Sequence, residues 1–359
     1  METSDYIKYI VGTVENYPKK LKNHLMKIFV DNKIVIKDKN KIMQISFDEI
    51  GLENVADLSL DEQLSKSLSG NIKAIKLFEN WEFIKDYKYS IMLNTNDYDL
   101  LLDKISNIKK VKEEDACFKY DGTFLNPIFY EDNQYKYLKF NLLYSSYDVE
   151  ERKNILLKYP FLVVFNIKYK YIEFRFDTLK SMYLANKFNN YIYRNLIDNM
   201  IRYFQENFEI ILSPLNLSFF RNITKQERAE LKLIAQSMRF RNGGQAELEV
   251  GNNEEYLLPF VDELTSLIQE YSDQLNSIPE FKNALNEYIN EMINMSDYPW
   301  VVLVWVGDVS SKNNKVKFIF NYMGEEYTLM QHMYSQSLIG MERMNHVTEY
   351  IIENRKYCE

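Results

Sequence analysis

The stretch FLVVFNI at residues 161–167, with the run YIEFRFD that follows at residues 171–177, decides the fold. The first stretch is apolar at nearly every position, which is typical of a strand buried on both faces. The second alternates between apolar and charged side chains, as in a half-buried strand. Apolar residues at helical spacing over residues 179–208 predict a long covering helix. We expect this strand, strand and helix to nucleate a sheet.

The length and composition predict a two-domain α+β protein. At 359 residues the chain exceeds the usual size of one domain, and its 46% hydrophobic and 27% charged residues are typical of a folded globular protein. The helix and strand patterns give way to a run of charges near residues 109–115. We therefore predict a β-rich α+β domain at residues 1–114. A larger α+β domain at residues 115–359 holds the central strands, the long helix, and C-terminal strands followed by a helix.

In the N-terminal domain the patterns predict a hairpin, a third strand, a helix, a strand and a second helix. These elements are expected at residues 27–36, 41–47, 58–78, 89–94 and 97–108. The larger domain adds a helix that begins at a capping box of Thr224 and Glu227, and two strand pieces about a Gly-Gly turn. Helical segments, C-terminal strands and a last helix follow. These are expected at residues 224–237, 238–250, 254–295 with a break at 278–279, 300–306, 316–322 and 331–356.

Several classes of protein are excluded by composition. A net charge of −8 argues against binding polyanions by bulk charge. Two cysteines cannot form a disulfide framework. The first 20 residues lack the apolar core of a signal peptide, and the longest apolar run, at 300–306, is far shorter than a membrane span. We expect a soluble cytoplasmic protein with no membrane partner.

The charges are unevenly distributed along the chain. Residues 178–245 carry ten basic and five acidic residues, whereas residues 246–300 carry one basic and twelve acidic residues. The first segment therefore has a net charge of +5 and the second of −11. The basic segment is expected either to pack near the acidic segment or to bind an equivalent acidic surface on a partner.

A basic stripe is predicted on the long helix, from residues spaced by seven, seven and eight positions. At about 100° per residue they share one face within about 80°. The stripe consists of Lys180, Lys187, Arg194 and Arg202. Such a face is suited to a nucleic-acid backbone, although a solvated helix face explains it as well.

A second basic feature is the sequence Arg239-Phe240-Arg241 before an Asn-Gly-Gly turn. On a strand, both arginines point to one side and could meet phosphates or base edges. The alternative is an outer hairpin face whose charges discourage edge pairing.

Four carboxylates could serve a metal-dependent enzyme: Glu173, Asp177, Glu247 and Glu249. A nuclease of the restriction type needs an Asp, then Glu-x-Lys, around Mg²⁺. Here Arg175 stands where the lysine would be expected, and an arginine does not exchange a proton. Cross-strand ion pairs are the alternative, and we expect no metal site and no cofactor. His332 and His346 would lie about 21 Å apart on the last predicted helix, too far to share a metal ion.

The sequence favours a non-catalytic binding subunit that contacts nucleic acid or an acidic protein through the basic residues Lys180, Lys187, Arg194, Arg202, Arg239 and Arg241. The use of Lys, Asn, Ile and Tyr indicates an AT-rich prokaryotic or phage source, and a multicomponent phage-defence or mobile-element system is the expected setting. The chain would act in a hetero-complex or a homo-oligomer. The alternative function is a metal-dependent nuclease or phosphoryl-transfer enzyme.

Overall fold

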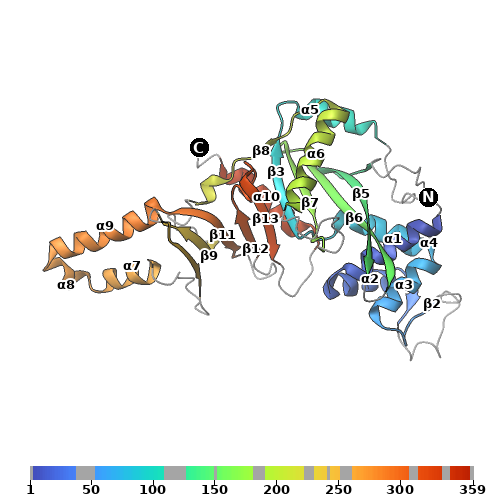
Figure 1. Cartoon of the computed structure of the whole chain (residues 1–359), viewed down its shortest axis with the longest axis horizontal. Helices are drawn as coiled ribbons and strands as arrows, with labels where there is room; N and C mark the ends of the chain where they lie inside the picture. The colour runs from blue at the N-terminus through green and yellow to red at the C-terminus, as the bar shows by residue number, and fades with distance from the viewer. Residues whose placement is uncertain are drawn as a thin grey trace. The chain divides into compact units, whose positions relative to one another are not determined.

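The computed structural model describes residues 3–37, 53–108, 127–148, 152–180, 191–221, 230–240, 243–250, 261–306, 314–333 and 340–355 (Figure 1). Its described residues form ten α-helices and a large antiparallel sheet of 11 strands, which confirms the α+β class. Contacts divide the chain into two compact units. Unit 1 holds Met1–Lys88, Met92–Ser213 and Leu338–Asn345, and unit 2 holds Tyr89–Ile91, Pro214–Ser337 and His346–Glu359. The predicted domain boundary at Glu114 lies outside the described residues and stays a prediction.

The N-terminal part of unit 1 is helical. Its helices are α1 (Thr3–Asn16), α2 (Lys19–Asp31), α3 (Leu60–Gly70) and α4 (Ile72–Ile84). The hairpin predicted at residues 27–36 is wrong, because Leu21, Leu25 and Phe29 recur at helical spacing and bury one face of α2. Only β1 (Val35–Ile36) is a strand, paired in parallel with β2 (Glu53–Asn54). The predicted strand at residues 41–47 lies outside the described residues.

The predicted helix at residues 58–78 is two helices. Ser59 and Glu62 form a capping box at the start of α3, where the Ser59 Oγ accepts from the Glu62 N–H. Asn71 ends α3 and caps α4, since its side chain accepts from the Lys73 N–H at 2.8 Å. The two N-caps, Ser59 and Asn71, therefore divide one periodic pattern into two helices.

The sheet of unit 1 is built on two long antiparallel strands, with a shorter strand on each side. The long strands are β5 (Tyr135–Asp148) and β6 (Lys153–Asn166), and the shorter ones are β4 (Ile128–Glu131) and β7 (Tyr171–Phe176). The order in the sheet is β3-β7-β6-β5-β4, where β3 (Tyr89–Asn94) runs from unit 2 into unit 1. Helix α5 (Tyr98–Ser106) follows β3, as predicted.

The predicted nucleus forms, with two corrections. The Phe204 ring of α6 (Ile192–Phe208) packs at a tilt against the rings of Phe165 and Phe174, with centroids 6.3 and 5.8 Å apart, so this helix covers β6 and β7. However, residues 178–180 are not helical, and residues 181–190 lie outside the described part, so the long-helix prediction is wrong at its start. The half-buried strand is also wrong, because all six residues of β7 are buried.

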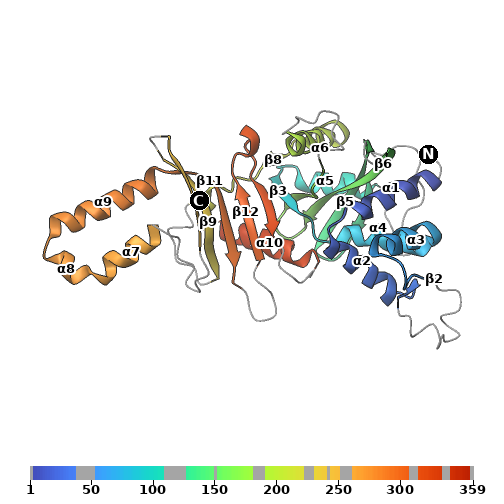
Figure 2. The same ribbon diagram turned by 60° about the horizontal axis from the view of Figure 1, so that its bottom comes forward.

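Helix α1 approaches β6 so closely that glycine is required. A Cβ atom on Gly12 would lie 1.8 Å from the Leu156 carbonyl oxygen. Thr13 Oγ1, one residue on, donates to the Lys158 carbonyl at 2.6 Å and fixes the same contact. Figures 1 and 2 show α1 lying against β6 in both views.

We expect Gly12→Ala to lower the free energy of unfolding by about 2 kcal/mol, since overpacking outweighs the gain in helix propensity. Urea denaturation measures the change. Lys8→Ala on the exposed side of α1 is the matched control and should change stability by less than about 0.5 kcal/mol. Greater stability in Gly12→Ala would contradict this close approach.

Unit 2 is built on five strands and three residues of β3. The strands are β9 (Leu231–Arg239), β10 (Gln245–Glu249), β11 (Asp297–Trp305), β12 (Asn314–Ile319) and β13 (Leu329–Met333), in the antiparallel order β10-β9-β11-β12-β13-β3. The described residues also include two short 3₁₀ helices, Ser218–Arg221 and Tyr322–Gly324, and the two-residue strand β8 (Ser213–Pro214), which pairs with β3. Helix α10 (Glu342–Arg355) and Phe220 cover one face, where Tyr350 meets Trp305 and Phe220 stacks on Phe318.

Two helix predictions in unit 2 are wrong. Residues 231–237 are strand rather than helix, because β9 pairs on both sides with β10 and β11 and tertiary pairing overrides a weak helical pattern. The capping box at Thr224 lies outside the described residues. The last helix begins at Glu342, whereas residues 331–333 belong to β13 and pair with β12.

Three helices form an arm in unit 2. They are α7 (Val261–Glu270), α8 (Ser272–Asn276) and α9 (Pro279–Met295), and Pro279 stands at the start of α9 as predicted. Figures 1 and 2 show α7 and α9 side by side, joined by α8, with α9 leading into β11. The helical prediction for this region is confirmed over its described residues.

Candidate functional site

The predicted basic stripe does not form one helix face. Lys180 is exposed but precedes the helix, and Lys187 lies outside the described residues. Arg194 is half-exposed and forms an ion pair with Asp198 at 3.7 Å, while Arg202 is exposed. The described part of α6 therefore presents one partly neutralised arginine and one exposed arginine, which is a weak phosphate-binding surface.

The carboxylates considered for metal binding are separated. Glu173 lies in unit 1, fully buried, with an oxygen 2.5 Å from Arg175 Nη2. Asp177 forms an ion pair with the buried Lys85. Glu247 and Glu249 lie in unit 2, exposed on β10. Among the described residues no three His, Cys, Asp or Glu side chains gather as metal ligands.

Arg175, read from the sequence as a poor substitute for a catalytic lysine, has a structural role. Its Nη2 also donates to Asn345 Oδ1 at 2.8 Å, so the guanidinium joins β7 to the first turn of α10. Burial would lower its pKa, but the charge and hydrogen bond of Glu173 raise it above the ordinary value. The two charged residues of the alternating pattern in β7, Glu173 and Arg175, thus form a buried ion pair within one strand.

A four-charge cluster lies at the centre of unit 1, and the sequence did not indicate it. Glu79 and Glu82 of α4 face Lys139 of β5 and Lys158 of β6, and all four side chains are nearly or fully buried. The Nζ atoms lie 2.5–2.9 Å from carboxylate oxygens of both glutamates. Helical spacing of three places both carboxylates on one side of α4, and this is the signal that could have predicted them.

The cluster is saturated with hydrogen bonds, which makes it structural. Tyr6 Oη donates to Glu79 Oε1 at 2.7 Å, and Lys139 Nζ also donates to the Glu79 carbonyl at 2.8 Å. Burial raises the pKa of Glu79, but the charges and hydrogen bonds of Lys139 and Lys158 have a larger opposite effect and lower the pKa to about 2. Four paired charges inside the core hold α4 against the sheet and leave no group to act on a substrate.

A serine and a histidine meet in unit 2. Ser90 Oγ lies 2.9 Å from His332 Nε2, on the neighbouring strands β3 and β13, and both residues are buried. His332 therefore does not share a helix with His346, which is exposed on α10. Because neither Ser90 nor His332 is open to solvent, the pair satisfies buried polar groups rather than forming a nucleophile and its base.

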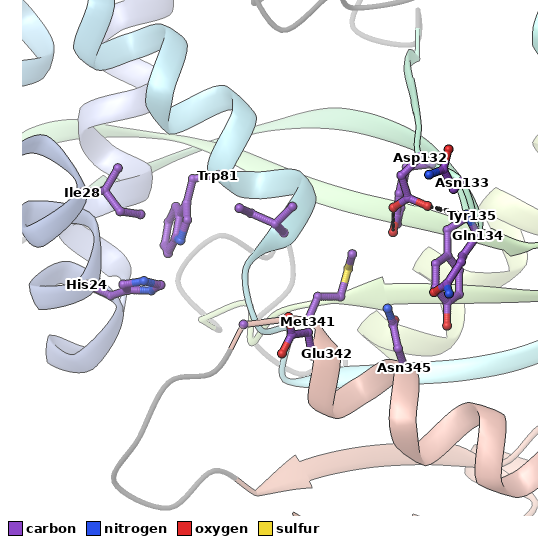
Figure 3. Close-up of a pocket in the computed structure, with 13 residues that line it drawn as sticks. His24, Ile28, Trp81, Asp132, Asn133, Gln134, Tyr135, Met341, Glu342 and Asn345 are labelled. Carbon is purple, nitrogen blue, oxygen red and sulfur yellow. Dashed lines mark hydrogen bonds between the residues drawn. The ribbon is translucent and has the colours of Figure 1, made fainter. Parts of the chain in front are cut away.

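Unit 1 has a cavity of about 850 Å³. Figure 3 shows His24 and Ile28 of α2 beside Trp81 on one side, Asp132 and Tyr135 on the other, and Met341 and Glu342 between them. Asp132 accepts hydrogen bonds from the N–H groups of Gln134 and Tyr135 and from Tyr137 Oη. The described lining contains no serine, cysteine or lysine, so it offers surfaces for a ligand but no catalytic set.

Basic side chains do meet on a sheet face of unit 2. On the central strand β11, Val304 is opposite both Lys232 of β9 and Lys315 of β12. Two residues away, Val302 is opposite Lys317 of β12. Opposed residues point to the same face, and Arg239, at the end of β9, is on that face with Trp300. This face, which we call the basic sheet face, lies opposite the one that α10 covers.

The charged side chains of the basic sheet face are accessible to different degrees, whereas its apolar centre, formed by Ala235, Val302 and Val304, is buried. Lys315 and Arg239 are exposed and Lys232 is half-buried, and none of the three forms an ion pair within the described residues. Lys317 Nζ lies 3.7 Å from the centroid of the partly exposed Trp300 ring. Burial lowers the pKa of Lys317, while Glu247 opposes this effect.

The basic sheet face contains one predicted residue, Arg239, and three others that the sequence argument did not select. Arg241 lies outside the described residues. Lys315 and Lys317 alternate with Val316 and Phe318, and this period of two could have indicated a charged strand face. The basic and acidic segments also meet in unit 2, where β9 pairs with β10 and Arg221 Nη1 lies 3.3 Å from Asp297.

Among the described residues no helix is both long and apolar enough to cross a membrane. The chain matches no protein-family model, no curated protein and no solved structure.

Proposed function

We propose that the chain is a non-catalytic binding subunit that holds single-stranded nucleic acid on the basic sheet face of unit 2. The observation that carries this proposal is the stacking of Lys317 over Trp300, beside Lys315 on the same strand. Lysines bind phosphates by displacing counterions, and a partly exposed indole offers a stacking surface for an unpaired base. Cation and ring together are suited to a single strand.

Local charge supports the same choice of ligand. The basic sheet face carries Lys232, Arg239, Lys315 and Lys317 against two carboxylates, Glu247 and Glu249, on the edge strand. The net charge of this face is +2 in a chain whose total is −8. An acidic strand at one edge would restrict the path of a polyanion to β9, β11 and β12, so phosphates would follow the lysines.

The cellular setting is part of the proposal. The composition of the chain supports a cytoplasmic protein of a multicomponent prokaryotic phage-defence or mobile-element system, where a binding subunit presents nucleic acid to other components. A nuclease or phosphoryl-transfer function is less well supported, since Glu173 and Asp177 are each paired with a cation inside unit 1.

We expect Lys315→Glu with Lys317→Glu to weaken binding of a fluorescein-labelled 20-nucleotide single strand by at least tenfold. Two favourable phosphate contacts are lost and two repulsive charges are added. Fluorescence anisotropy at 100 mM NaCl, with EDTA present, measures the dissociation constant for single-stranded and double-stranded DNA and RNA.

The matched control is Lys19→Glu with Lys20→Glu, two exposed lysines at the start of α2 in unit 1. It makes the same change in net charge and should weaken binding less than twofold. Equal losses in both variants, or an acidic protein that binds the basic sheet face when no nucleic acid does, would reject the proposal.

A further inference from the structure

The helical arm of unit 2 exposes large apolar side chains. Five of them, each between 48% and 57% exposed, lie within 22 residues: Leu267, Tyr271, Ile278, Phe281 and Tyr288. Ile268 of α7 and Ile289 of α9 are buried in the same region. Single exposed apolar residues are ordinary, but a contiguous patch on helices marks an interaction surface.

On helix α9 the exposed and the buried apolar residues lie on different sides of one apolar stripe. At about 100° per residue, Phe281 and Tyr288 lie within about 20° of each other on α9, and Ile289 lies about 80° to one side of Phe281. Leu285 and Met292, which lie between Phe281 and Ile289 round the helix, are half-buried, so Phe281 and Tyr288 form the exposed edge of the apolar stripe.

Helix α7 repeats this arrangement. Ile268 is buried, while Leu267 and Tyr271 lie about 100° and 60° round the helix from it and are exposed. The two helices contact each other, and the less exposed apolar residues lie to one side of the exposed ones on each: Leu264 and Ile268 on α7, and Leu285, Ile289 and Met292 on α9. The exposed apolar residues Leu267, Tyr271, Phe281 and Tyr288 lie beside this contact and form an apolar surface, which we call the groove of the arm, against which a third helix can pack.

The charge of the arm indicates which kind of helix fits. Val261–Met295 carries seven acidic residues and one lysine, a net charge of −6. A second copy of the arm would bring a further −6 into the same groove, so self-association is opposed by repulsion. A helix with basic residues beside its apolar stripe has the complementary charge.

We propose that the α7–α9 arm is a docking site for a cationic amphipathic helix of a partner protein, which completes a three-helix arrangement. This inference is independent of the basic sheet face, because it concerns a different surface and a ligand of opposite charge. The apolar groove provides affinity and the acidic rim selects the basic partner.

The probe is an 18-residue peptide of leucine and lysine, with leucines at positions i, i+3, i+4 and i+7. Titrated with the full chain in 150 mM NaCl, the labelled peptide should bind at micromolar concentration and gain helicity by circular dichroism. A peptide of the same composition with scrambled order should bind at least tenfold more weakly. Equal binding of both peptides would overturn the inference, because charge alone would then explain it.

The variant that tests the groove is Phe281→Asp with Tyr288→Asp, which should weaken peptide binding at least tenfold without changing the Tm, since both residues are about half exposed. The control is Ile72→Asp with Leu100→Asp, equally exposed residues of unit 1. Sedimentation of the full chain completes the test. A dimer that the groove variant dissociates, or peptide binding that survives in this variant, would reject a helical partner at the arm.

Discussion

Glu82→Gln is expected to lower the free energy of unfolding by about 3–5 kcal/mol, the largest single effect predicted for this chain. Glu82 is fully buried and lies within 2.9 Å of Lys139 Nζ and within 2.5 Å of Lys158 Nζ. A neutral amide would leave two ammonium groups with Glu79 as their one nearby carboxylate. An uncompensated charge in the core costs more than the lost attraction, because neither lysine can reach water.

The matched control uses an exposed ion pair of unit 1. Lys170 Nζ lies 2.7 Å from Asp99, and both side chains are more than half exposed. Lys170→Met should change stability by less than about 1 kcal/mol. Urea denaturation of Glu82→Gln, of Lys158→Met and of the two combined gives the coupling energy. If the double variant were as unstable as the sum of the single changes, the two residues would not be energetically coupled.

The same cluster predicts acid sensitivity. The pKa of Glu79 is about 2 in the folded protein and near its ordinary value of 4.5 when unfolded. A lowered folded pKa means that the stabilisation is complete above pH 4.5 and is lost as the pH falls toward 2. Below pH 4.5 the unfolding transition should therefore shift to lower urea concentration.

Asp86→Asn is expected to stabilise the protein, but only at high pH. Asp86 is buried, and neither of its carboxylate oxygens has a hydrogen-bond partner within the described residues. Burial raises its pKa to about 7, although the charges of Arg343, Lys85 and Arg175 lower it and that of Asp177 raises it. The folded state thus prefers the neutral acid, and an asparagine supplies a neutral side chain of similar shape.

The sign of the pH dependence follows from the raised pKa. The unfolded carboxyl ionises near pH 3.8 and the folded one near pH 7, so wild-type stability falls as the pH rises between these values. About three pKa units correspond to roughly 4 kcal/mol, an upper limit to the gain from Asp86→Asn at pH 8.5. Urea curves at pH 4 and pH 8.5 test it. The same gain at both pH values would show that ionisation is not its cause.

The sequence predicted the central strands because their signal is local. The run at residues 161–167 is apolar enough to need burial on both faces, and it forms part of β6. The alternation of β7 was misleading, because Glu173 and Arg175 neutralise each other and can be buried as a pair. Alternation of apolar and charged residues in a strand indicates a solvent-exposed face only when the charged residues find no ion-pair partner in the fold.

The binding surfaces were less accessible to sequence reasoning. A basic stripe read at helical spacing depends on one unbroken helix, and Lys180 precedes α6. The basic sheet face joins Lys232, Lys315 and Lys317 from strands more than 80 positions apart, which no local pattern can register. The four-charge cluster needs α4, β5 and β6 to meet. Such contacts arise from topology, and only the folded chain shows them.

The measurement that tests the central claim most directly is the salt dependence of single-strand binding by the full chain. Four cations on the basic sheet face predict that log K falls with log [NaCl] with a slope of about −3, at about 0.7 per phosphate contact. Lys315→Glu with Lys317→Glu should reduce this slope to about −1.4, whereas Lys19→Glu with Lys20→Glu should leave it unchanged. A slope near zero, or one that the two double variants change equally, would contradict nucleic-acid binding on this face.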